Sequence, residues 1–347
     1  MTTTTGPVNL LIATPLGDEF LDRIRAVDPR INVINRPDLL GTPTYIADHH
    51  PPANRTPAQE AEFRDLIAQA EIIFDLDTDT APHYATLGTN LRWIQTTSAG
   101  VGPAIKRFGL DQTDVIVTTS SGVHAGPLAE FVMMAALMFI KNAAYLLAEK
   151  QKHSFNRFCA GEMTSKTLAV VGPGRVGSNV ARLARAFGMR TTALPRRDRS
   201  AEEIGVDKVY QRAELHTMLA EADVVVLIMP HTPETENMID AAAIAQLKPT
   251  AILVNIARGQ VIDEDALIDA LRNNRIAGAA LDVFRKEPLP ADSPLWDLPN
   301  VIINPHSAST ADTEDAKITD LFCENLRYYL DGDYDKMRSK LDKQQLY

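Results

Sequence analysis

Three side chains in the last third of the chain could together bind an anion and move a proton. Arg258, Glu287 and His306 each follow a short apolar segment whose composition is typical of a buried strand. Arginine presents an always-charged fork that can bind a carboxylate and polarise a neighbouring oxygen. Histidine releases and takes up a proton near neutral pH, and a carboxylate beside it would orient the ring and stabilise its charged form. Taken one at a time, Arg258 is better explained by a surface ion pair, Glu287 by a loop charge and His306 by a hydrogen-bonded loop histidine. Because the three residues follow successive predicted strands, we favour a shared site.

Short β-branched runs alternate with helical patterns along almost the whole chain, which predicts an α/β fold with parallel sheets. A chain of 347 residues exceeds what one hydrophobic core usually organises, so we expect two doubly wound domains. The first series of strands is expected at residues 8–12, 31–34, 72–74, 91–94 and 115–117. A long helix at 128–152 precedes a second series, with strands at 167–171, 190–194, 223–229, 251–255, 277–282 and 301–304. Because open α/β sheets bind ligands at the carboxyl ends of their strands, we expect an active site to which both domains contribute.

A glycine-rich turn follows the predicted strand at 167–171 and opens a predicted helix at 178–187. Its sequence is Gly172-Pro173-Gly174-Arg175-Val176-Gly177, a spacing typical of dinucleotide-binding βαβ units. The first glycine would form the tight turn, the second would let the backbone approach a pyrophosphate, and the third would let helix and strand pack closely. The free N–H groups of the helix N-terminus would bind the phosphates. An ordinary strand-to-helix turn is the alternative, but the context favours a nicotinamide dinucleotide site.

The end of the next predicted strand bears on which nicotinamide cofactor is bound. An NAD site usually carries an acid there to hold the ribose 2′-hydroxyl, but this chain has Pro195. Arg196, Arg197 and Arg199 follow, and a guanidinium matches the oxygens of a 2′-phosphate. The sequence therefore favours NADP, while NAD stays an alternative because Asp198 would serve it if the strand ends later. A solvated basic loop is the other explanation of these arginines.

Composition and charge argue against several other classes of protein. The formal net charge of -10 disfavours a nucleic-acid or anionic-membrane partner, since such binders need clustered Lys and Arg. Cys159 and Cys323 are far apart, and the histidines form no metal-ligand spacing, so we expect no metal site and expect His49 and His50 to be solvated. The longest apolar run, residues 131–140, is too short to span a bilayer, and no targeting segment is recognisable. We therefore expect a cytoplasmic protein.

Ordered motifs between Gln95 and Ser309 resemble those of the D-isomer-specific 2-hydroxyacid dehydrogenases, in the glyoxylate/hydroxypyruvate reductase-like branch that prefers NADP. They are Ser98-Ala99-Gly100-Val101, Ala129-Glu130, the glycine turn, Pro230-His231-Thr232-Pro233-Glu234-Thr235, Asn255 to Leu267, Gly278 to Pro288 and Pro305-His306. The resemblance implies that Arg258 binds a 2-oxo acid, that His306 donates and accepts the proton, and that Glu287 is its partner. It also implies a substrate pocket in which backbone amides hold the carboxylate, formed by Ser98, Ala99, Gly100, Val101 and His124. For His124, a polar hinge residue is an equal alternative.

The resemblance also implies the remaining cofactor contacts and the domain organisation. Asp282 would lie beside the nicotinamide carboxamide, and further contacts would come from Arg175, Val176, Pro230, His231, Thr235, Ile256, Ala257 and Ser309. A Rossmann cofactor domain at 122–306 would be inserted in a flavodoxin-like substrate-binding domain formed by 1–121 and 307–347, and the protein would be a homodimer. Pro173 departs from the family, which usually has a larger apolar residue there. The first 90 or so residues resemble the family only in the order of their predicted strands and helices.

The leading hypothesis is NAD(P)-dependent reduction of a short 2-oxo acid, such as glyoxylate or hydroxypyruvate, to a D-2-hydroxy acid. A nucleotide-sensing interaction protein like the corepressors known on this fold is the non-enzymatic alternative, and only turnover separates the two. A phosphoglycerate dehydrogenase is disfavoured because the 41 residues after His306 leave little room for the regulatory domain that many of these enzymes carry. A formate dehydrogenase is disfavoured because Glu287 stands where that enzyme has Gln.

Overall fold

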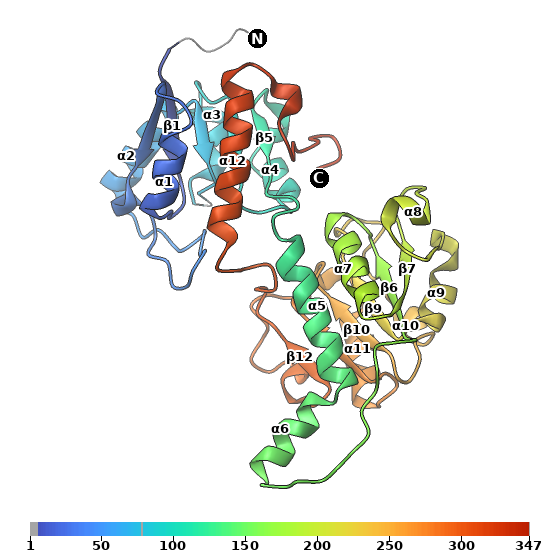
Figure 1. Ribbon diagram of the computed structural model, residues 1–347. Coiled ribbons are helices and arrows are strands. Elements are labelled where there is room, and N and C mark those ends of the chain that lie inside the picture. Colours follow the sequence, from blue (N-terminus) through green and yellow to red (C-terminus); the bar gives the residue numbers. More distant parts are fainter. Residues whose placement is uncertain (1–5, 78, 347) are drawn as a thin grey trace. The chain divides into compact units, whose positions relative to one another are not determined.

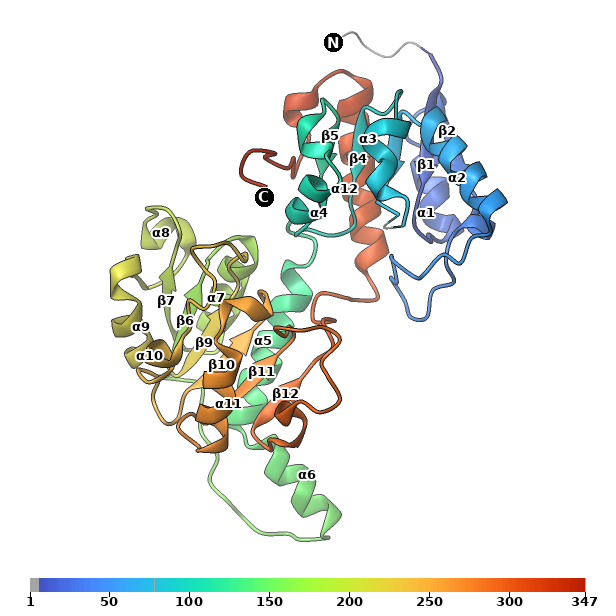
Figure 2. The ribbon, with the colours of Figure 1, turned by 180° about the vertical axis from the view of Figure 1, so that it is seen from behind.

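The computed structural model describes residues 6–77 and 79–346, which form two compact units, each built on one parallel sheet (Figures 1 and 2). The first unit contains the described residues up to Val123 and those from Thr310 onward, and the second runs from His124 to Ser309. The two sheets have five and seven strands. The predicted α/β class with two doubly wound parallel sheets is therefore confirmed.

The five-stranded sheet of the first unit has the order β2-β1-β3-β4-β5, which is the flavodoxin-like order. Its strands are β1 (Val8–Ile12), β2 (Ile31–Asn35), β3 (Ile72–Phe74), β4 (Trp93–Gln95) and β5 (Ile116–Thr118). Its helices are α1 (Asp18–Arg25), α2 (Pro57–Gln69), α3 (Tyr84–Leu87), α4 (Gly102–Arg107) and α12 (Glu314–Leu330). α12, the red helix of Figure 1, brings the end of the chain back to this sheet.

Both faces of this sheet are buried, because helices cover each of them. Leu10 and Ile12 of β1 belong to the cluster that includes apolar side chains of α1 and α12. Leu11, between them, belongs to the opposite cluster, which includes side chains of α2, α3 and α4. Figures 1 and 2 show these two layers from opposite sides. Alternate strand residues point to opposite faces, so a sheet covered on both sides needs continuous apolar strands.

The seven-stranded sheet of the second unit has the order β12-β11-β10-β9-β6-β7-β8. Its strands are β6 (Thr167–Val171), β7 (Arg190–Leu194), β8 (Lys208–Val209), β9 (Val224–Leu227), β10 (Ile252–Asn255), β11 (Gly278–Leu281) and β12 (Val301–Ile303). Its helices are α5 (Ala125–Ile140), α6 (Ala143–Gln151), α7 (Arg175–Ala186), α8 (Ala201–Ile204), α9 (Leu215–Glu221), α10 (Ala241–Ile244) and α11 (Glu264–Arg272). The chain runs from β6 outward to β8 and then returns to β9 on the other side of β6. The order of strands therefore reverses between β6 and β9, and ligands of such sheets bind at that point.

The helix predicted at 128–152 is wrong in one respect, because it is two helices. α5 ends at Ile140, and Asn142 has a left-handed conformation with φ 55° before α6 begins. Asparagine tolerates this conformation better than most residues, and it ends the run of helical hydrogen bonds. Among the described residues no single helix is long and apolar enough to cross a membrane; α5 and α6 together pass that test by length and composition, but they are bent by 61°.

Candidate active site

The glycine turn between β6 and α7 has the geometry of a phosphate-binding loop. Gly172 has φ +88°, and a Cβ there would lie 2.8 Å from the main chain of Met229, so only glycine fits. A Cβ on Gly177 would lie 2.8 Å from Cγ1 of Val170, which explains how closely α7 packs on β6. A Cβ on Gly174 would meet nothing within 4 Å, so the backbone there faces open space. The turn thus leaves room for a pyrophosphate beside the first N–H groups of α7, and its residues fit a dinucleotide.

An arginine holds this turn in place from outside. Arg199 donates hydrogen bonds to the carbonyl oxygens of Pro173 (2.8 Å) and Glu203 (3.1 Å). Its guanidinium therefore supports the turn, and its predicted contact with a 2′-phosphate stays a prediction. Arg175 and Val176, predicted to contact the cofactor, are the first residues of α7. Val176 is half-buried against the core, and Arg175 is exposed.

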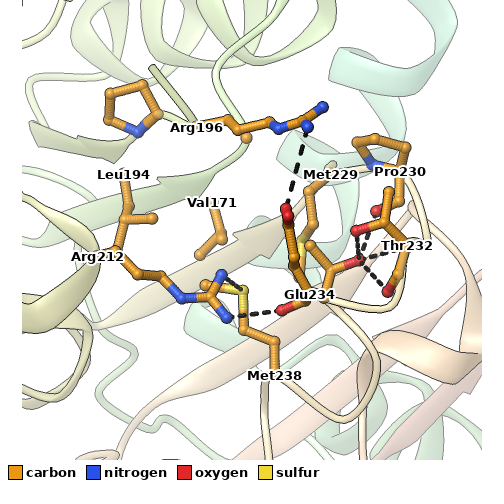
Figure 3. Close-up of a pocket in the computed structure, with 12 residues that line it drawn as sticks. Val171, Leu194, Arg196, Arg212, Met229, Pro230, Thr232, Glu234 and Met238 are labelled. Carbon is orange, nitrogen blue, oxygen red and sulfur yellow. Dashed lines mark hydrogen bonds and ion pairs between the residues drawn. The ribbon is translucent and has the colours of Figure 1, made fainter. Parts of the chain in front are cut away.

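A cavity of about 470 Å³ opens beside the turn, at the carboxyl ends of β6, β7 and β9 (Figure 3). Because β6 lies between β7 and β9 in the sheet, the loops that follow these three strands meet at one edge. Its volume is in the range of small-molecule sites, and its wall is mostly apolar. The lining residues are Val171, Gly172, Leu194, Pro195, Arg196, Arg212, Met229, Pro230, Thr232, Glu234, Thr235 and Met238.

Two charged residues of this cavity, Arg212 and Glu234, were not assigned to the site from the sequence. The carboxylate of Glu234 lies 4.0 Å from the guanidinium of Arg196. Arg212 donates to the main-chain oxygen of Glu234 (2.7 Å) and to Sδ of Met238 (2.9 Å). Arg197 follows in the exposed turn after β7. Glu234 stands inside a motif that the sequence analysis quoted, whereas Arg212 precedes a short helix and belongs to no recognisable motif.

The loop after β9 is braced by its own side chains. The hydroxyl of Thr235 donates to the carbonyl of Pro230 (2.8 Å) and accepts from the N–H of Thr232 (2.8 Å). His231 is exposed, with Nε2 3.6 Å from a carboxylate oxygen of Glu236. Of the predicted contacts in this loop, Pro230 and Thr235 line the cavity and His231 does not.

The segment after β10 is folded into a tight turn that presents Arg258. The Asn255 side chain accepts from the N–H of Ala257 (3.0 Å) and donates to the carbonyl of Arg258 (3.0 Å). Arg258 is half-buried and donates from its guanidinium to the carbonyl of Ala257 (2.6 Å). Ile256 and Ala257, both predicted cofactor contacts, are buried.

Gly259 lets this turn approach the segment that carries Glu287. A Cβ at Gly259 would lie 1.9 Å from the carbonyl carbon of Phe284, a separation that no packed pair of atoms allows. The main chain after Arg258 therefore lies directly on the main chain that leads to Glu287. The structure thus brings together two segments that lie about 25 residues apart in the sequence.

Asp282 organises the loop that carries the predicted proton donor. Its Oδ1 accepts from the side chain of Asn304 (2.5 Å) and from the N–H groups of Ser307 (2.8 Å) and Ala308 (2.9 Å). Its carbonyl accepts from the N–H of His306 (2.9 Å). Asp282 is buried, with 2% of its surface exposed. This carboxylate therefore holds the main chain just after His306 and the side chain of Asn304 just before it.

His306 and Glu287 form a hydrogen-bonded pair. Nδ1 of His306 lies 2.7 Å from Oε2 of Glu287, and Oε1 of Glu287 accepts from the N–H of Phe284 (2.9 Å). His306 has φ +55°, and the Glu287–Pro288 peptide bond is cis. The two side chains are 45% and 35% exposed, so a ligand can reach them. Since Nδ1 is used by Glu287, Nε2 is the nitrogen left for a substrate; Ser309, further along the loop, is half-buried.

In the first unit, the segment Ser98–Val101 lies in the turn between β4 and α4. Ala99 and Gly100 are exposed, and their N–H groups have no hydrogen-bond partner among the described residues. The segment is fixed at its start by Asp75, whose carboxylate accepts from the N–H (3.2 Å) and the hydroxyl (2.7 Å) of Thr97. The turn thus offers two adjacent donors to an anion.

Two histidines are buried. His124, the first residue of the second unit, precedes α5, and its carbonyl accepts from the N–H of Leu128 (3.2 Å). The expectation that His49 is solvated is wrong: it is 9% exposed, with Nε2 3.4 Å from Asp315 and 3.6 Å from Glu314 of α12. Burial alone would lower the pKa of His49, but the surrounding carboxylates outweigh it and raise that pKa. No group of three or more His, Cys, Asp or Glu in the described ranges could hold a metal ion.

Comparison with known families shows which protein family this chain matches. The family model described as "D-isomer specific 2-hydroxyacid dehydrogenase, NAD binding domain" matches residues 132–308, just over half of the chain. The chain belongs to the D-isomer specific 2-hydroxyacid dehydrogenase family. This dehydrogenase is therefore an oxidoreductase that acts on CH–OH groups with NAD(P), and its cofactor domain contains the glycine turn and the His306–Glu287 pair.

Two curated relatives illustrate the range of the family. The chain is 37% identical over 227 residues to a glyoxylate reductase of Korarchaeum cryptofilum, a match that covers 63% of this chain and 67% of the relative. It is 36% identical over 273 residues to a D-3-phosphoglycerate dehydrogenase of Synechocystis, which covers 76% of this chain and 47% of the relative. The chain thus spans about half the length of that second relative.

Solved structures match almost the whole chain. A D-isomer specific 2-hydroxyacid dehydrogenase family protein of Aeromonas salmonicida is 28% identical, with a TM-score of 0.79 over 97% of this chain and 100% of that one. A probable 2-hydroxyacid dehydrogenase of Rhizobium etli, solved in complex with NADP, HEPES and L(+)-tartaric acid, is 25% identical. Its TM-score is 0.75 over 99% of this chain and 100% of that one. The two-domain fold of the dehydrogenase is therefore that of the family.

Proposed function

We propose that this chain reduces a short 2-oxo acid to the corresponding D-2-hydroxy acid, with NADPH as the preferred reductant. The observation that carries the proposal is the His306–Glu287 pair, with 2.7 Å between Nδ1 and Oε2, on a loop held by a buried carboxylate. The glyoxylate reductase among the relatives supports a short substrate such as glyoxylate or hydroxypyruvate.

The side chains of the site divide the chemistry among them. When bound, the reduced nicotinamide supplies a hydride to the carbonyl carbon of the substrate. Arg258 binds the 2-oxo acid through its oxygens and polarises the carbonyl, because its charge is permanent. His306 donates the proton from Nε2 to the carbonyl oxygen in reduction and takes it back in oxidation. Glu287 fixes the ring orientation and stabilises the imidazolium that this exchange requires.

The first unit supplies the carboxylate-binding part of the site in this proposal. The exposed N–H groups of Ala99 and Gly100 bind the substrate carboxylate, and Ser98 and Val101 flank it. Two adjacent backbone donors suit an anion, because they need no side-chain reorganisation. His124, at the start of the second unit, is proposed as a further substrate contact. In this proposal the first unit binds the substrate carboxylate, and the second unit binds the cofactor and contributes Arg258 and His306.

The preference for NADPH rests on the cavity beside the glycine turn. Pro195 stands where an acid would hold the ribose of NAD, and Arg196 lines the same wall. A guanidinium there suits the 2′-phosphate of NADP, and the relative from Rhizobium etli was solved with NADP. Arg197 adds positive charge at the same turn.

Turnover of purified protein tests the proposal. Nicotinamide absorbance is followed with NADPH or NADH against a panel of 2-oxo acids, for the natural chain and for His306→Gln and Glu287→Gln. Loss of general acid-base catalysis costs about 10²- to 10⁴-fold, so we expect kcat to fall by that factor for His306→Gln. His216→Gln, on the exposed face of α9, is the matched control and should keep full activity. Cofactor binding without turnover on any 2-oxo acid would contradict the proposal.

We also propose that the protein is a homodimer formed through α6 and the loop that follows it. None of the residues of α6 is buried, and this helix projects from the second unit (Figure 1). Leu147 is 59% exposed and Phe155 fully exposed, and such apolar groups usually mark an interface. Leu147→Glu with Phe155→Glu should give a monomer in light scattering, whereas Phe187→Glu should not. A natural chain that is already monomeric would refute the proposal.

A further inference from the structure

The cofactor cavity contains a carboxylate, although the usual position for one is occupied by Pro195. Glu234 comes from the loop after β9 and lines the same cavity as Pro195 and Arg196. Figure 3 shows its carboxylate directed at the Arg196 guanidinium, 4.0 Å away. A carboxylate thus reaches the cavity from the loop after β9, a strand that β6 separates from β7 in the sheet. We propose that Glu234 sets the balance between NADPH and NADH, an inference that rests on the proposed role of Arg196 at the 2′-phosphate.

The position of Glu234 is fixed through its main chain. Arg212 donates to its carbonyl oxygen (2.7 Å) and, through its other terminal nitrogen, to Sδ of Met238 (2.9 Å). The hydroxyl of Thr235 closes the same loop onto Pro230 (2.8 Å). The Glu234 side chain itself is 72% exposed, so it can rotate without disturbing any packing. The loop thus holds a mobile carboxylate at the edge of the cavity.

NADPH carries a 2′-phosphate where NADH has a 2′-hydroxyl, and Glu234 has opposite effects on the binding of the two groups. A 2′-phosphate carries about -1.5 to -2 charges, so its binding to Arg196 competes with the carboxylate and places like charges together. A ribose 2′-hydroxyl donates a hydrogen to a carboxylate, which is a charge-assisted bond. Glu234 therefore weakens binding of NADPH and strengthens binding of NADH.

We assign Arg199 to support of the glycine turn rather than to discrimination between the cofactors, because both its terminal nitrogens donate to backbone oxygens. It donates to the carbonyl oxygens of Pro173 and Glu203, which are backbone groups of the glycine turn and of α8. Substitution of Arg199 should therefore weaken the binding of NADPH and of NADH to the same extent. Within the cavity lining, Arg196 and Glu234 place opposed charges beside the 2′ position, and Arg197 adds positive charge at the turn.

Binding of two small probes to the whole protein tests this inference without requiring turnover. Calorimetry compares 2′,5′-ADP, which carries the 2′-phosphate, with 5′-AMP, which carries the hydroxyl. Glu234→Gln should bind 2′,5′-ADP about two- to fivefold more tightly, as expected for removing an exposed like charge. It should bind 5′-AMP no better than the natural chain. In the same variant, the ratio of kcat/KM for NADPH to kcat/KM for NADH should also rise.

Control variants separate this inference from the proposal on which it rests. Glu202→Gln removes the same charge from the exposed surface of α8, outside the cavity lining, and should leave the ratio of the two affinities unchanged. Arg196→Met should weaken 2′,5′-ADP about tenfold and 5′-AMP little. If Arg196→Met behaves so but Glu234→Gln changes both probes equally or neither, the role of Glu234 is refuted alone. If Arg196→Met leaves discrimination intact, the NADPH proposal fails as well.

Discussion

Replacement of Asp282 by alanine should lower kcat by about 10²-fold while cofactor affinity changes little. The resemblance to the family implied that Asp282 contacts the nicotinamide carboxamide. The structure shows a different use of its Oδ1, which accepts from Asn304, Ser307 and Ala308 around His306. The two roles predict different kinetic consequences, so the variant separates them.

The size of the effect follows from the hydrogen bonds that are lost. Hydrogen bonds to a charged acceptor contribute about 1.5–3 kcal/mol each. Ser307 is exposed and its N–H can bond to water, but Ala308 is buried, so its N–H would be left without an acceptor at a cost of about 1–3 kcal/mol. His306 has φ +55°, a conformation that costs a non-glycine residue about 1–2 kcal/mol. Without Asp282 the loop should leave this conformation, and a displacement of about 1 Å in a catalytic group costs about 10²-fold in rate.

The assay measures kcat at saturating NADPH and the Kd of NADPH by fluorescence titration, for Asp282→Ala and Asp282→Asn. Asparagine keeps an acceptor oxygen but not the charge, so kcat should fall only about tenfold. The Kd should stay within about threefold of the natural value in both variants, because the loop that carries His306 is not part of the cavity lining. A Kd weakened more than tenfold with an unchanged kcat would refute the positioning role.

Two further predictions concern stability. Gly259→Ala should lower the free energy of unfolding by about 2–4 kcal/mol and abolish activity, because its Cβ would overlap the main chain of Phe284. Urea unfolding measures the stability. A variant that is as stable as the natural chain and active would contradict the packing described. His49→Gln should flatten the pH dependence of stability. Against the effect of burial, the carboxylates of Glu314, Asp75 and Asp315 raise the folded-state pKa of His49 above 6.5. The stabilising contribution of His49 is therefore complete below pH 6.5 and is lost as the pH rises through the raised pKa. Equal slopes of unfolding free energy against pH in the two proteins would refute it.

Much of the second unit could be predicted from its sequence. The strands at 167–171 and 190–194 were predicted with the bounds that the structure shows. The first is a largely apolar run that ends at the glycine turn, and the second contains two β-branched threonines and ends before Pro195. The glycine turn could be recognised because the spacing of its three glycines is a local feature of the sequence, and Gly172 and Gly177 are needed where a side chain would not fit. The long helix at 128–152 could not be divided, since Lys141 and Asn142 do not interrupt its helical composition.

The sequence by itself determined the fold class, the cofactor class and the order of Arg258, Glu287 and His306, because strand rhythm and glycine spacing are local properties of the chain. Only the tertiary structure decided which residues share a site. Glu234 meets Arg196 because β6 lies between β9 and β7 in the sheet, and Arg212, which follows β8, lines the same cavity. His49 is buried by a helix that begins more than 260 residues later. Such contacts depend on how strands and helices pack, which no local pattern encodes.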